Sequence, residues 1–131
     1  GTHVPDASPA GIVRSLATAA TGAVGSVEVT VDISHTWIGD LRLTLRSPSG
    51  DDVVLHDQAG GPTANPRETY TAATTPGLGA LAGKPIAGNW QLVVADLAAN
   101  DVGKLNRWKL VIRAERVRQW FNILLLGATL C

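Results

Sequence analysis

The sequence contains almost no sulfur: one cysteine, Cys131, and no methionine among 131 residues. A single cysteine excludes an internal disulfide. A domain of this length does not need one, because it can bury about 65–70% of its unfolded surface. The missing disulfide therefore does not argue for the cytosol. Because no methionine stands even at position 1, we expect a fragment or a processed form.

An excess of charge of either sign is also missing. Eleven Lys and Arg residues balance eleven Asp and Glu residues, so the formal net charge is zero. A nucleic-acid-binding protein usually shows a basic excess or patch. A transmembrane helix needs about 20 apolar residues, more than any apolar run here provides. We therefore expect neither nucleic acid nor a membrane span, and no signal peptide, internal repeat or low-complexity segment is visible.

The sequence is instead rich in residues that favour turns, with 14 glycines and 7 prolines, and only 17% of its residues are charged. This composition suits short strands joined by many turns, as in a sandwich or barrel, and fits a helical bundle poorly. The length suits one domain. The composition therefore predicts a single all-β domain.

Two runs of strict alternation within residues 26–46 give the strongest structural signal. Side chains along a strand point alternately to the two faces of a sheet, so each run predicts a half-buried strand. β-branched residues dominate the first run, as a pleated and half-buried surface favours. The residues expected to face the core are Val27, Val29, Val31, Ile33, Leu41, Leu43 and Leu45.

The beginning of the chain is less regular. Residues 1–11 are expected to be an irregular entry segment, because Pro5 and Pro9 cannot donate to a strand ladder. Residues 12–17 predict an edge strand. A helix through Ala20 remains an alternative, since alanine is a good helix former.

Turn residues predict two hairpins. Gly22 and Gly25 bracket a turn before the strand that begins near Val27, which favours a hairpin there. Residues 47–50, Ser-Pro-Ser-Gly, suit a type I turn. The next strand, over residues 53–56, is expected to return antiparallel to the Leu41–Leu45 run.

The second half of the chain holds the longest irregular stretch. Residues 57–89 carry many glycines and prolines, with one short strand plausible near 68–72. Long loops of this kind are usually functional or packed as structured connections. Residues 90–96 then predict a strand. Because Val93 and Ala95 make its second face apolar too, we expect a central strand covered on both sides.

Three tryptophans bear on the core and on binding. Trp90 shares the phase of aliphatic neighbours in its strand, and Trp108 does so in the last strand, over residues 105–113, so both are expected in the core. Trp37 lies in the corner between the two alternating runs. It is the best candidate for exposure among the three; packing in the core or corner is expected, with a binding contact as the alternative.

One loop could hold calcium. Calcium prefers carboxylate and carbonyl oxygens on flexible loops, and Asp96, Asn100 and Asp101 fall in one polar connection. The loop lacks the EF-hand pattern, so a hydrogen-bonded loop without metal remains the alternative. The three histidines are scattered and match no zinc spacing.

Nucleophilic catalysis finds little support. A triad needs a nucleophile, a base within hydrogen-bond reach and an orienting acid. Asp32 and Ser34 share a strand face, but His35 falls on the other face, and no Gly-x-Ser-x-Gly elbow occurs. We expect this chain to be non-catalytic, with His35 bonded to backbone and Asp40 accepting from amides in the corner.

Four blocks together resemble a known family, the P domain or Homo B domain. They are residues 35–41, His-Thr-Trp-Ile-Gly-Asp-Leu; residues 45–50, Leu-Arg-Ser-Pro-Ser-Gly, with Val-Leu-His at 54–56; residues 88–96; and residues 103–110. Each block alone is weak, but their order and spacing match the family. The resemblance covers about residues 3–114, so we expect a P domain over 1–114 and an unrelated tail over 115–131.

The resemblance implies a jelly-roll β-sandwich of about eight mostly antiparallel strands. It implies a non-catalytic accessory domain of a secreted kexin- or furin-like serine endopeptidase, or less often a metalloprotease. Such a domain packs on the upstream catalytic domain of the same chain, stabilises it, shifts its pH and calcium dependence, and could contact the protein substrate. No cofactor is required, and calcium remains open. The implied location is extracellular or at the cell surface.

Two other functions and the tail remain open. The chain could be a module that binds protein or polysaccharide on a non-protease secreted or surface protein, or an independent hydrolase. In the tail, a charged step precedes the apolar run from Trp120 to Leu126. An exposed run of this kind is an aggregation liability, so it should pack on something. A structural strand or helix, or a remnant of cloning or of the reading frame, is expected, and a membrane or partner anchor is the alternative.

Overall fold

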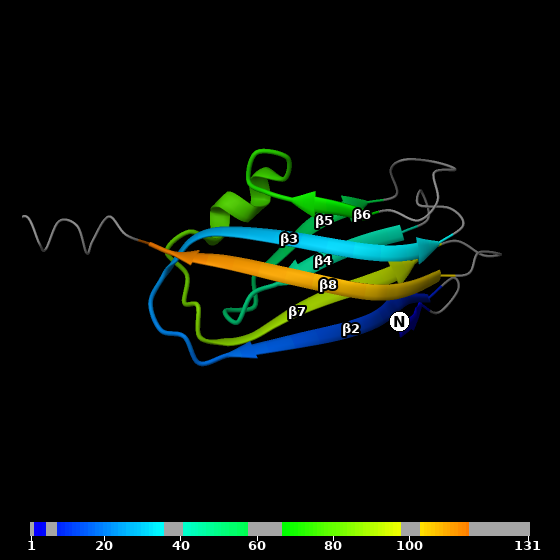
Figure 1. Cartoon of the computed structure of the whole chain (residues 1–131), viewed down its shortest axis with the longest axis horizontal. Coiled ribbons are helices and arrows are strands. Elements are labelled where there is room, and N and C mark those ends of the chain that lie inside the picture. Colours follow the sequence, from blue (N-terminus) through cyan, green and yellow to red (C-terminus); the bar gives the residue numbers. More distant parts are fainter. Residues whose placement is uncertain (1, 5–7, 36–40, 58–66, 98–102, 116–131) are drawn as a thin grey trace, which may run out of the picture.

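The computed structural model describes residues 2–4, 8–35, 41–57, 67–97 and 103–115. These residues form two four-stranded antiparallel sheets packed face to face, which confirms the all-β sandwich (Figure 1). The strands are β1 (Thr2–Val4), β2 (Ser8–Thr18), β3 (Val24–His35), β4 (Leu41–Arg46), β5 (Asp52–Asp57), β6 (Arg67–Tyr70), β7 (Gly88–Asp96) and β8 (Gly103–Ala114), with a short 3-10 helix, η2 (Pro76–Leu81).

The strand order is that of a jelly roll. Sheet A has the order β1-β8-β3-β6, and sheet B has the order β2-β7-β4-β5. The pairs β1 with β8, β2 with β7, β3 with β6 and β4 with β5 are all antiparallel. They form a folded ribbon whose successive pairs fall alternately in sheet A and sheet B. The jelly-roll expectation is therefore confirmed.

The core lies between the sheets and follows the alternation read from the sequence. The inward side chains of β3 and β4 are at most 2% exposed, while their outward neighbours are half-buried or exposed. Burial of aliphatic side chains on this scale is the main favourable term in folding. The buried residues of these two strands are Val24, Val27, Val29, Val31, Ile33, Leu41, Leu43 and Leu45.

The second predicted hairpin is confirmed. β4 and β5 pair antiparallel, with Leu45 opposite Val53. The backbone N–H of Gly50 donates to the carbonyl of Ser47 at 2.9 Å, which closes the turn. The Ser-Pro-Ser-Gly sequence therefore does what its turn residues predict.

The first predicted hairpin is wrong. β2 and β3 lie in different sheets, so the chain crosses the sandwich at Gly22–Val24 and does not fold back on itself. This crossing is bonded to the segment before β7: Val24 N–H donates to the carbonyl of Lys84 at 2.8 Å, and Ile86 N–H donates to that of Gly22 at 3.0 Å. Those bonds are long-range in sequence, and turn residues alone could not indicate them.

The beginning of the chain is more regular than expected. Within residues 1–11, expected to be irregular, Thr2–Val4 pair with β8 and Ser8 already belongs to β2. The edge-strand prediction for residues 12–17 is confirmed, since among the described strands β2 pairs only with β7 and lies at the edge of sheet B. The helical alternative is therefore wrong.

The long irregular stretch contains two packed elements. β6 confirms the short strand expected near 68–72 and pairs with β3, with Tyr70 opposite Val29. The helix η2 is not indicated by the sequence pattern. Its Leu78 and Leu81 are each 1% exposed and belong to the core. The described part of this stretch is therefore a structured connection.

Two expectations about β7 and β8 need correction. Trp90 is fully buried as expected, but Trp108 is only half-buried. Near Trp108 the register of β8 against β3 shifts at a bulge, and β8 has no described strand on its other side there. β7 is central, but its outer face is covered only at Ala95, which is 1% exposed, whereas Val93 is half-buried.

Candidate functional site

The structure describes one of the three predicted calcium ligands. Asp96 is the last residue of β7 and is fully buried, while Asn100 and Asp101 lie outside the described residues. The backbone of Asp96 is held between strands, opposite Ser8 of β2 and Leu41 of β4. Within the described ranges, no group of three or more His, Cys, Asp and Glu could hold a metal. The calcium site therefore stays a prediction.

The roles predicted for residues in the corner between β3 and β4 also stay predictions. Trp37, the candidate binding contact, and Asp40 lie outside the described residues. His35 ends β3 opposite Gly103, but its side chain is not described.

The outer face of β3 carries a structural hydrogen-bond network. Asp32 and Ser34 share this face, as expected. The side-chain amide of Asn106 donates to Ser34 Oγ at 2.9 Å and to Asp32 Oδ1 at 3.4 Å. The guanidinium of Arg107 lies 3.8 Å from Asp32. These contacts join the neighbouring strands β3 and β8, so we interpret Asp32 and Ser34 as structural residues.

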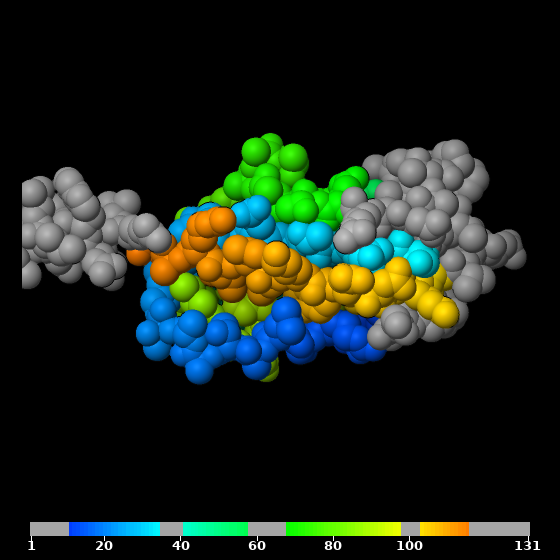
Figure 2. Space-filling view, viewed as in Figure 1, coloured from blue at the N-terminus to red at the C-terminus, as the bar shows by residue number. Residues whose placement is uncertain are grey.

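The rest of the outer face of sheet A is similarly polar. Thr30 and Thr69 share a hydrogen bond of 2.9 Å between their hydroxyls, and the guanidinium of Arg113 donates to the carboxylate of Glu28. Figure 2 shows this face, with β8 and β3 running side by side across it. Polar cross-strand pairs of this kind suit a sheet face that is exposed to water, and they stabilise the sheet modestly.

The outer face of sheet B is different, because a row of three valines and one threonine crosses all four of its strands. Val13 lies opposite Val93, Val93 opposite Thr44, and Thr44 opposite Val54. We call these four residues the valine row. Val13 is 45% exposed and Val54 is 49% exposed. Val93 and Thr44 between them are half-buried. Exposed apolar side chains bordered by polar residues can mark a protein-interaction surface.

Charged side chains border the valine row on both sides. On one side Arg46 donates to Asp52 through two nitrogens, at 2.6 and 3.0 Å, and this bonding lowers the pKa of Asp52. On the other side, Arg42 makes no hydrogen bond or ion pair with the described part of the chain. The row thus combines exposed apolar area with charged side chains on both sides, among them Arg42, which lies opposite Asp57 in the ladder.

Sequence patterns alone did not single out the valine row. Its signal is the apolar second face of residues 90–96, for which we expected coverage by a second layer. Only the sheet order shows that Val13 and Val54 extend this apolar face across the neighbouring strands.

Within the described part of the chain, no helix is long and apolar enough to cross a bilayer. The tail over 115–131, for which a membrane anchor was an alternative, lies outside the described residues except for Glu115.

Comparisons with known proteins agree with the jelly roll. The family model of the proprotein convertase P-domain matches residues 24–112. The chain is 48% identical over 94 residues to a calcium-dependent protease of Trichormus variabilis, covering 70% of this chain and 14% of that protein. It is 40% identical over 111 residues to leupeptin-inactivating enzyme 1 of Streptomyces exfoliatus, covering 82% and 24%.

A solved structure shows the same fold. The serine protease of Aeromonas sobria, in complex with its chaperone, superimposes with a TM-score of 0.69 at 19% identity, over 85% of this chain and 24% of that one. The chain thus spans a quarter or less of each of these relatives. With a family match over most of its length and two relatives at 40% identity or more, this chain belongs to the proprotein convertase P-domain family.

Proposed function

We propose that this P domain is the non-catalytic accessory domain of a secreted serine endopeptidase of the subtilisin/kexin type, in which it stabilises the catalytic domain. The observation that carries the proposal is the family match together with relatives at 40–48% identity that are named as proteases. In those relatives the matched region is a small part of a much longer chain. A catalytic domain in the same chain is therefore the partner that best accounts for the resemblance.

The valine row supports this proposal as the contact surface for the catalytic domain. Val13 and Val54 expose apolar area that a partner would remove from water, and Arg42 next to them can pair with a carboxylate. On the outer face of sheet A, Arg107 and Arg113 already pair with Asp32 and Glu28.

Secretion and calcium belong to the same proposal. One relative is named a calcium-dependent protease. Calcium bound by Asp96, Asn100 and Asp101 would tie the end of β7 to the loop that follows it. A domain that is attached to the catalytic domain could also contact the protein substrate.

The first test is the full-length gene. We expect it to encode, before position 1, a subtilisin-like domain with its Ser, His and Asp. A metalloprotease domain there would change the proposed class of enzyme. A gene without any protease domain would refute the proposal and favour a module that binds protein or polysaccharide.

The second test measures binding of the 131-residue chain to that catalytic domain expressed alone. Val54→Asp would place a carboxylate in the contact, which costs about 1–3 kcal/mol, or about 5- to 150-fold in the dissociation constant. Thr69→Asp, which adds the same charge to the outer face of sheet A, is the control and should bind like the parent. Equal affinity for both variants would show that the valine row is not the contact surface.

A further inference from the structure

The outer edge of β8 is only partly paired. β1 pairs with residues 103–105 of β8, through Thr2, His3 and Val4. Over residues 106–114, β8 pairs with β3 on its inner side and has no strand on its outer side within the described chain. Backbone N–H and C=O groups along such an edge are free to accept a further strand.

The two sheets are also uncovered along this edge. Leu16 of β2 lies opposite Trp90 in the ladder and has the inward phase, yet Leu16 is 41% exposed whereas Trp90 is fully buried. In the space-filling view, yellow-green atoms of β7 and the segment before it are visible between β8 and β2 (Figure 2). We call this opening between β2 and β8 the seam.

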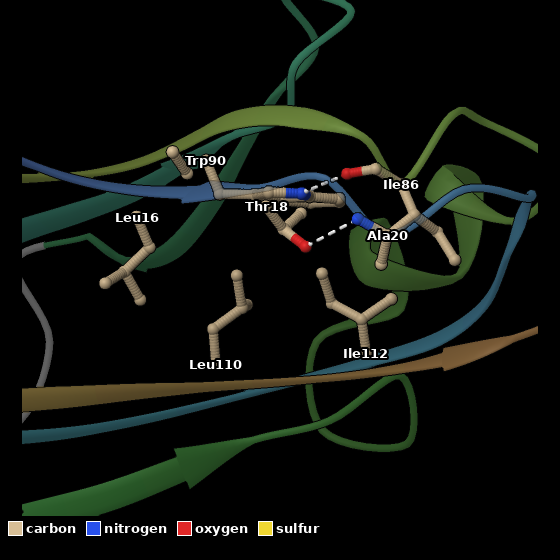
Figure 3. Close-up of a pocket in the computed structure, with 8 residues that line it drawn as sticks. Leu16, Thr18, Ala20, Ile86, Trp90, Leu110 and Ile112 are labelled. Carbon is tan, nitrogen blue, oxygen red and sulfur yellow. Dashed lines mark hydrogen bonds between the residues drawn. The ribbon is translucent and has the colours of Figure 1, made fainter.

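An apolar cavity of about 360 Å³ lies in the seam. Leu16 and Thr18 border it on the β2 side, Leu110 and Ile112 point into it from β8, and Trp90 lies across its inner wall (Figure 3). Leu110 and Ile112 are half-buried, although they have the phase of core residues. The cavity is therefore a part of the sandwich interior that lacks a cover.

The polar groups in the cavity are already engaged. The indole N–H of Trp90 donates to the carbonyl of Ile86 at 2.9 Å, and the hydroxyl of Thr18 accepts from the N–H of Ala20 at 3.1 Å. A small-molecule site usually offers a few convergent polar groups that orient the ligand. Here the hydrogen-bonding groups without a partner strand among the described residues lie along the β8 backbone, and this favours an extended strand as occupant.

The direction of β1 indicates where that strand comes from. β1 runs antiparallel to β8, so a chain that continued β1 at its amino end would run along residues 106–114 without a turn. The chain after β8 is less suited, because Glu115 N–H donates to the carbonyl of Ala23 at 2.8 Å, on the β3 side. We propose that an extended segment continuing β1 at its amino end, with apolar side chains at alternate positions, pairs with the free edge of β8 and covers the seam.

This inference rests on the proposed function, in which further polypeptide precedes the domain. About seven residues at 3.3 Å each would reach from β1 to the level of Ile112. The seam would then make the stability of the domain depend on the segment that connects it to the protease.

A designed extension tests this inference in the full 131-residue chain. In one version the segment Thr-Val-Thr-Val-Thr-Val-Thr is placed before Gly1. In a second version the segment is Val-Thr-Val-Thr-Val-Thr-Val, so that the valines occupy the other face of the strand. A Gly-Ser segment of equal length is the control. A one-residue shift exchanges the two faces of a strand, so only one of the two segments can direct its valines into the seam. We expect that segment to slow amide exchange in residues 106–114 by about 10-fold or more. The Gly-Ser control should leave this exchange unchanged.

A matched pair of variants then locates the strand. Leu16→Asp places a charge in the seam, and Val13→Asp places the same charge on the opposite face of β2 at similar exposure. The protection should be lost in the first variant and kept in the second. Failure of both phases to protect β8, or equal sensitivity to both variants, would overturn the proposal.

The native sequence distinguishes this inference from the proposed function. If a protease domain is encoded but the residues before position 1 lack alternating apolar positions, the strand proposal fails and the proposed function stands. If no protease domain is encoded, the proposed function fails, whereas the exchange data still decide whether the seam accepts a strand.

Discussion

Trp90 and Trp108 have the same phase relative to aliphatic neighbours in sequence but different surroundings in the fold. Trp90 is fully buried in the central strand β7 and donates to the carbonyl of Ile86 at 2.9 Å. Trp108 packs against the core only in part, beside the bulge of β8. We therefore expect Trp90→Ala to lower the free energy of unfolding far more than Trp108→Ala.

The magnitudes follow from burial and from the lost hydrogen bond. Truncating a buried tryptophan to alanine costs about 3–5 kcal/mol. For Trp90 we expect the upper end, because the carbonyl of Ile86 would lose its donor. For the half-buried Trp108 we expect roughly half as much, about 1.5–2.5 kcal/mol. Since domains of this kind are stable by about 5–15 kcal/mol, Trp90→Ala removes a large share of the total.

Urea denaturation followed by far-UV circular dichroism measures both variants without relying on tryptophan fluorescence. Trp90→Phe removes the donor and leaves a smaller cavity than Trp90→Ala does, so its loss should be clear but smaller than that of Trp90→Ala. Equal losses for Trp90→Ala and Trp108→Ala would refute the burial assigned to these residues. A loss below about 1 kcal/mol for Trp90→Ala would refute the placement of β7 in the core.

Three further predictions test other features. Gly11→Ala should destabilise by more than about 2 kcal/mol, because φ is +61° and the new Cβ would lie 2.1 Å from the carbonyl oxygen of Val94. Gly22→Ala, at φ +109° with open space around it, should cost less, about 1–2 kcal/mol from backbone strain alone. Tyr70→Phe should change stability by less than about 1 kcal/mol in the same denaturation assay, because the buried hydroxyl makes no hydrogen bond of good geometry among the described residues, although the carboxylate of Glu68 lies near it; a clear loss would contradict this. Arg46 lowers the pKa of Asp52 below its ordinary value of 3.8, so the stability that Asp52 adds is present above that pH and is lost as pH falls through the lowered pKa; the deficit of Asp52→Asn should shrink on acidification, and a growing deficit would refute the pairing.

The sequence alone could predict only part of the candidate site. Asp96 is described, and its burial at the end of β7 could not be read from its sequence neighbours. Trp37, Asn100 and Asp101 lie outside the described residues, so the binding and calcium predictions built on them stand as predictions. The valine row was missed because it needs four strands in one sheet, and the pairing of Val93 with both Val13 and Thr44 is a property of the sheet order.

Strand positions and the inward faces of β3 and β4 could be predicted from the sequence alone. Alternation has a period of two residues, and burial selects apolar side chains at every second position. The same local logic predicted the β4–β5 turn, since its sequence suits that backbone.

Partner choice between strands was decided only by the tertiary structure. Gly22 and Gly25 indicate a turn, but the backbone bonds of this segment to residues 84–86 carry the chain across to the other sheet. Likewise, both tryptophans have an inward phase, yet only the neighbours that a strand acquires in the sheet determine how deeply each is buried. Phase is a property of one strand, whereas burial and the open seam depend on which strands lie beside it.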